Sequence, residues 1–85
     1  MKPETALLKA RLETKLGLKL ARCRTLPGSM RPYVGIAVPW SGSSAELHGW
    51  LARQLGFAPF YCGSNYDGTF TADIEIRKLE AHFTL

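Results

Sequence analysis

The chain has 85 residues, of which 46% are hydrophobic and 11% aromatic, a composition that excludes intrinsic disorder and allows a single small domain. The formal net charge of +4 is unevenly distributed along the sequence. Residues 1–32 carry eight basic and two acidic side chains, whereas residues 33–85 carry three basic and five acidic ones. A basic segment of this kind attracts phosphates or an acidic partner.

No apolar stretch is long enough to span a membrane, and charged residues interrupt the region where a signal peptide would be apolar. We therefore expect a cytoplasmic protein with no membrane partner. Cys23 and Cys62 are expected to be reduced, buried or half-buried thiols. Their spacing from His48 and His82 does not resemble a metal motif, in which ligands come in close pairs, so we predict no metal and no other cofactor.

The first predicted element is a helix over about residues 3–16. Leu8, Leu12 and Leu16 recur at every fourth residue, as the apolar stripe of an amphipathic helix does. Gly17 follows as a plausible C-terminal stop.

Residues 18–26 fit either an extension of that helix or a strand. We favour the strand, with Arg22 and Arg24 projecting on one side, because the Pro-Gly-Ser sequence at 27–29 then begins a connecting loop. The apolar, partly β-branched run at 33–38 predicts a strand at the centre of a sheet, covered on both faces.

A second helix is predicted over about residues 44–55. Ser43 and Glu46 have the spacing of a capping box, and Gly56 is a plausible stop. The apolar residues between them recur at helical spacing; they are Leu47, Trp50, Leu51 and Leu55.

The stretch IAVPWSGSS, which leads into this helix, resembles the phosphate-binding loop of the ATP pyrophosphatase family. Ser43 stands in place of the second glycine of the family pattern, and Ala45 stands in place of its aspartate. Helix capping is therefore the favoured interpretation of the loop.

The C-terminal third predicts strands. Residues 57–62 suggest a short edge strand, Asp67-Gly68 signals a hairpin, and residues 70–77 alternate as a half-buried strand does. The apolar phase flips in residues 79–85, which indicates either a β-bulge near Arg77-Lys78 or a tight turn into a fifth strand. We expect that terminal strand to lie at an edge of the sheet, where it could pair with a second copy to form a homodimer.

Together these elements predict one α+β domain over residues 1–85, ordered roughly α-β-β-α-β-β, with a mostly antiparallel sheet packed against two helices in two layers. The predicted core consists of Leu8, Leu12, Leu16, Ile36, Val38, Leu47, Leu51, Leu55, Phe70, Ile74 and Ile76.

The leading functional hypothesis is a small non-enzymatic protein that occupies a macromolecular surface, as a protein-directed inhibitor or adaptor of phage-like character. Trp40 and Tyr66 are its candidate interface residues, because rigid aromatic side chains anchor protein interfaces. Phe60 and Tyr61 are expected instead to plug the core of the domain.

The alternative hypothesis is DNA or RNA binding through the basic N-terminal segment, with Tyr33 and Trp40 available to stack on bases. The candidate contacts to phosphates, or to an acidic partner, are Lys9, Arg11, Lys15, Lys19, Arg22, Arg24 and Arg31.

A third hypothesis is a small ribonuclease-type toxin centred on His48, whose side chain titrates near neutral pH. His82 is expected on the exposed side of the last strand. No Ser–His–Asp or paired-carboxylate arrangement follows from the spacing, so we assign no catalytic residue and expect the protein not to be an enzyme.

Overall fold

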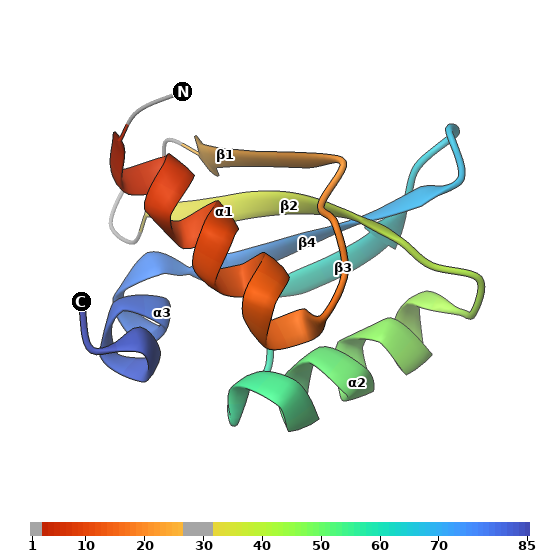
Figure 1. The fold of residues 1–85 in the computed structure, drawn as a ribbon. Coiled ribbons are helices and arrows are strands. Elements are labelled where there is room, and N and C mark those ends of the chain that lie inside the picture. The colour runs from red at the N-terminus through yellow and green to blue at the C-terminus, as the bar shows by residue number, and fades with distance from the viewer. Residues whose placement is uncertain (1–2, 27–31) are drawn as a thin grey trace.

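The computed structural model describes residues 3–26 and 32–85 (Figure 1). The helices are α1 (Pro3–Leu16), α2 (Ser44–Leu55) and α3 (Ile76–Phe83). The strands are β1 (Arg22–Leu26), β2 (Tyr33–Pro39), β3 (Tyr61–Ser64) and β4 (Thr69–Glu75). The predicted α+β class with an antiparallel sheet is confirmed, and α3 is an additional helix.

The four strands form one sheet in the order β1-β2-β4-β3, and every neighbouring pair is antiparallel. In this register Arg24 lies opposite Gly35, Gly35 opposite Asp73, and Asp73 opposite Tyr61. Because residues that are directly opposite share a face of the sheet, these four form one row across it.

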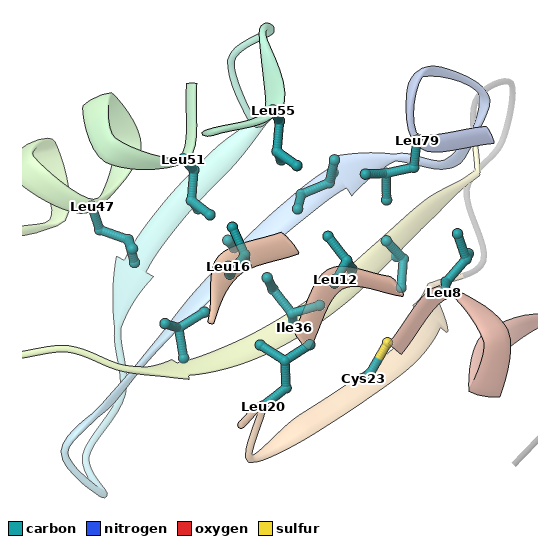
Figure 2. Packing of buried hydrophobic residues seen from close by; sticks show 14 residues of the cluster. Leu8, Leu12, Leu16, Leu20, Cys23, Ile36, Leu47, Leu51, Leu55 and Leu79 are labelled. Carbon is teal, nitrogen blue, oxygen red and sulfur yellow. The ribbon is translucent and has the colours of Figure 1, made fainter. Parts of the chain in front are cut away.

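The hydrophobic core lies between the helices and one face of the sheet. Figure 2 shows leucines of α1 and α2, with Leu79 of α3, converging on strand residues such as Cys23 and Ile36. Every predicted core residue is buried except Phe70 and Ile76, which are half-buried and pack against the same cluster. No helix within the described residues is long and apolar enough to cross a membrane.

The capping box predicted for α2 is present. The Ser43 hydroxyl accepts a hydrogen bond from the Glu46 N–H, and the Glu46 carboxylate accepts one from the Ser43 N–H, both at 3.1 Å. The bond from the Ser43 backbone, and then that from its side chain, lower the pKa of Glu46. Capping is therefore the interpretation of the Ser/Gly loop that the structure confirms.

The prediction for the C-terminal segment was wrong: residues 76–83 form α3, not a bulged or fifth strand. Ile76, Leu79 and Phe83 have the spacing of one helix face, and Leu79 is fully buried against the sheet. The terminal strand through which we expected a second copy to pair is therefore replaced by a helix. The edges of the sheet in the described part are β1 and β3.

Two predicted strands also differ in detail. Strand β2 is central as predicted, but the helices cover only one of its faces; on the other face, neighbouring side chains bury its small residues. The Leu26 side chain of β1 is one of these neighbours: it covers Gly35, since its Cδ1 lies 3.0 Å from where a Cβ on Gly35 would be. Strand β3 is an edge strand, but it begins at Tyr61, later than the predicted 57–62 segment.

Candidate binding face

The face of the sheet opposite the core, hereafter the open face, is not covered by any of the described helices. Figure 1 shows α1 in front of the sheet, and the buried leucines of α1, α2 and α3 all pack on this same side. By strand alternation, the open face consists of Arg22, Arg24, Leu26, Tyr33, Gly35, Ala37, Pro39, Tyr61, Gly63, Thr69, Thr71, Asp73 and Glu75.

Aromatic rings are exposed on and beside the open face. Phe60 is 67% exposed and Tyr61 is 53% exposed, so the prediction that they plug the core was wrong. Since β3 begins at Tyr61, this side chain points away from the core, and Phe60 leans onto Tyr33 with the ring centroids 4.7 Å apart. The Tyr33–Phe60 stack fixes one aromatic surface at this end of the sheet.

The Tyr61 ring lies flat along its own strand because Gly63 has no side chain. A Cβ at Gly63 would lie 2.7 Å from the Tyr61 Cζ atom, which is closer than real contacts allow. Gly63 therefore leaves room for a second exposed ring surface, at the β3 edge of the open face.

A shallow cavity of about 440 Å³ lies on the open face. Its lining comprises Arg22, Arg24, Leu26, Gly35, Ile36, Ala37, Asn65, Thr71 and Asp73. One wall is held by side-chain hydrogen bonds: the Thr71 hydroxyl donates to Asn65 Oδ1 at 2.9 Å, and Asn65 Nδ2 donates to Thr69 Oγ1 at 3.0 Å. The cavity thus has polar walls whose amide and hydroxyl groups already bond one another.

Charged groups surround the cavity. Arg22 lies 3.6 Å from the Asp67 carboxylate, and both side chains are more than half exposed, so the pair contributes little to stability. Hydrogen bonds from the Thr69 side chain and backbone, with a smaller contribution from Arg22, lower the pKa of Asp67. Within the described residues Arg24 forms no ion pair.

Asp73 is the unusual group at this site. Its Oδ1 atom is buried and has no hydrogen-bond partner among the described residues. Burial raises the pKa of Asp73, and the positive charge of Arg24 opposes that effect. Buried acceptors are nearly always paired in folded proteins, so a carboxylate oxygen without a donor indicates a place for a ligand donor.

The structure separates the predicted basic residues. Arg22 and Arg24 project together onto the open face, as predicted for a strand. Three of the predicted basic residues lie on α1, which packs against the other face of the sheet: Lys9, Arg11 and Lys15. Lys19 is exposed in the connection between α1 and β1, and Arg31 lies outside the described residues.

The two predicted protein-interface residues have different environments. Tyr66 is fully exposed in the turn between β3 and β4, as expected for a hairpin tip. Trp40 is half-buried: its ring packs tilted against that of Trp50 with the centroids 5.4 Å apart, and its Nε1 donates to the Ser43 carbonyl at 3.1 Å. Trp40 therefore supports the start of α2.

The groups suited to catalysis do not meet at one site. His48 is half-buried on α2, and His82 is exposed as predicted, but on α3 beside Phe83. Burial raises the pKa of the free thiols of Cys23 and Cys62, which makes them weak nucleophiles at neutral pH. Across residues 3–26 and 32–85, no group of three or more His, Cys, Asp or Glu could hold a metal ion.

The sequence patterns missed Asp73 and Asn65 as site residues. The alternation in residues 70–77 correctly places Asp73 on the polar side of its strand. Its proximity to Arg24 depends on β2 lying between β1 and β4, which local patterns do not reveal.

No protein-family model, no curated protein and no solved structure matches this chain. Its function is inferred from the geometry and chemistry of the open face.

Proposed function

We propose that this protein binds single-stranded nucleic acid on the open face of its sheet. The observation that carries the proposal is the exposure of Phe60 and Tyr61 beside Tyr33, together with Arg22 and Arg24, on a sheet whose helices lie on the other side. Tyr33 and Tyr61 lie on strands and Phe60 is stacked on Tyr33, so the backbone that carries these rings needs little ordering when a base stacks on them.

Stacking supplies the attractive part of this interaction. One base on one aromatic side chain contributes about 1–3 kcal/mol, and any base can stack because each has a π-face. A four-stranded sheet with exposed aromatic rings is also the surface on which one common RNA-binding module stacks two or three bases. The Tyr33–Phe60 pair and the Tyr61 ring offer two such surfaces.

Arg22 and Arg24 supply the contacts to phosphates. The Arg22–Asp67 pair is weak enough for a phosphate to replace the carboxylate. Each phosphate neutralised on a single strand lowers the slope of log K against log salt by about 0.7, so two arginines predict a slope of about −1.4. The basic residues of α1 add to the long-range field of a chain with net charge +4.

Fluorescence anisotropy with labelled single-stranded RNA and DNA, over a series of salt concentrations, tests this proposal. Arg22→Ala with Arg24→Ala should remove most of the salt dependence and weaken binding. The matched control, Arg11→Ala with Lys15→Ala, removes the same charge from exposed positions on α1 and should leave the slope nearly unchanged. Equal losses from the two pairs would contradict binding on the open face.

A second candidate is the protein-directed inhibitor or adaptor. Two observations favour it: Asp67 and Asp73 offset the arginines of the open face, and Tyr66 extends fully exposed from the adjacent turn. Tyrosine and arginine are common anchors of protein interfaces. Flat titrations with every nucleic acid, together with a protein partner lost on Tyr61→Ala and Tyr66→Ala, would favour this candidate.

A further inference from the structure

We propose that the cavity on the open face binds a guanine base, with the Asp73 carboxylate accepting hydrogen bonds from the base and Arg24 donating to it. This inference rests on the proposed function and names the base that it selects. It starts from the buried Asp73 Oδ1 atom, which has no donor among the described residues.

The other polar groups of the cavity wall already have partners. Asn65 bonds Thr69 and Thr71 through both ends of its amide, which fixes the orientation of the amide and leaves it one further N–H and one further lone pair. Arg22 faces Asp67. Among the described residues, Asp73 and Arg24 are therefore the charged lining groups that form no side-chain hydrogen bond or ion pair, one an acceptor and the other a donor. The guanidinium of Arg24 has five N–H donors, so it can contact a base and a phosphate together.

The placement of these two residues selects a neutral ligand. Asp73 and Arg24 lie in one row on either side of Gly35, separated by two strand spacings, or roughly 10 Å. A cationic group would be repelled at the Arg24 end of this row, and an anionic group at the Asp73 end. A neutral planar group with donors at one end and an acceptor at the other satisfies both residues, and the cavity of about 440 Å³ has room for it.

Among the four bases, guanine fits this pattern best. Its N1–H and N2 amino group are adjacent donors that match the two oxygens of one carboxylate, while O6 and N7 accept from arginine. Cytosine and adenine offer one amino group beside an acceptor, and uracil offers one N–H between two acceptors. The terminal torsion of an aspartate side chain rotates over a broad range, so either Asp73 oxygen can turn toward the base.

The test compares labelled uridine octamers that differ in one central base: guanine, hypoxanthine, adenine or cytosine. We expect guanine to bind about tenfold more tightly than adenine or cytosine, within the range of a bidentate base contact. Hypoxanthine retains N1–H and O6 but lacks the N2 amino group, so it should lose most of that advantage. Asp73→Asn should abolish the guanine preference, measured for each protein as the ratio of its affinities for the guanine-containing and all-uridine octamers.

Asp67→Asn is the matched control, since Asp67 is an exposed carboxylate outside the cavity lining, and the guanine preference should survive this change. A loss of the guanine preference in Asp73→Asn would not be explained by unfolding of the variant. Because burial raises the Asp73 pKa in the folded state, ionisation of Asp73 destabilises the fold as pH rises through that pKa. Asp73→Asn should thus be at least as stable as the wild type at pH 7, with the difference shrinking as pH falls through the raised pKa of Asp73 toward about 3.9.

The outcomes separate the two proposals. Octamers that bind without a base preference, or with a guanine preference that Asp73→Asn leaves intact, overturn the guanine site while the proposed function stands. A preference for another base that depends on Asp73 overturns guanine as the ligand. If no octamer binds even at low salt, the proposed function fails and the guanine site fails with it.

Discussion

Gly63 shows how strongly one position shapes the open face. Its missing side chain lets the Tyr61 ring lie along β3, where a base can reach it. The backbone at Gly63 does not require a positive φ, so an alanine can adopt it. The cost of a substitution therefore falls on the position of the Tyr61 ring rather than on the strand.

We expect Gly63→Ala to weaken single-strand binding about as much as Tyr61→Ala does, because the new methyl group displaces the ring. Tyr61 is half-exposed and can swing away, so the free energy of unfolding should stay within about 0.5 kcal/mol of the wild type. Anisotropy and chemical denaturation measure the two effects separately. Unchanged RNA affinity would show that the Tyr61 ring surface does not contribute to binding.

Single residues were predicted well where the local pattern decides their environment. The leucine stripes and the apolar run of β2 predicted buried side chains, and these are buried. Phe60 and Tyr61 were misplaced because a large aromatic residue favours burial on average. Their exposure depends on the residue at which β3 begins and on its edge position, which tertiary pairing sets.

At the element scale, α2 carries the clearest local signals. Its capping box, its leucine stripe and its stop at Gly56, which has a φ of +80°, all agree with one another. By packing against the core side of the sheet, α2 supports the strands that present the open face. Its stability therefore matters to the site even though it contributes no residue to the open face.

Ser43→Ala removes the hydroxyl that caps α2 and should lower the free energy of unfolding by about 1 kcal/mol. Ser43→Asp keeps a capping oxygen and should retain most of that stability. Urea denaturation at pH 7 measures both variants. Equal stability of Ser43→Ala and the wild type would show that the cap contributes nothing to the fold.

Helix α3 marks the limit of local patterns. Its apolar residues satisfy the two-residue period of a strand and the spacing of a helix face, and the segment has only 8 residues. The burial of Leu79 against the core settles the choice, and this contact is long-range. Residues 18–26 were ambiguous for a similar reason, and they form a strand from Arg22 because β2 pairs with it.

At the scale of the whole molecule, the order β1-β2-β4-β3 creates the open face. In this order β4 lies between β2 and β3, so Asp73 on β4 lies in one row with Arg24 and Tyr61. The charge polarity of the sequence survives only in part, because α1 and β1 direct their basic residues to different sides. Neither consequence follows from composition or periodicity, since both depend on strand pairing.

The central claim is that a single strand lies across the open face, and NMR mapping tests it most directly. Uniformly ¹⁵N-labelled protein is titrated with an unlabelled uridine octamer containing one guanine, and the shift of each amide signal is followed. The account predicts the largest changes around Arg24, Tyr61 and Asp73, and small ones along α1 and α2. Changes concentrated around Arg11 and Lys15 on α1, or no changes at low salt, would contradict it.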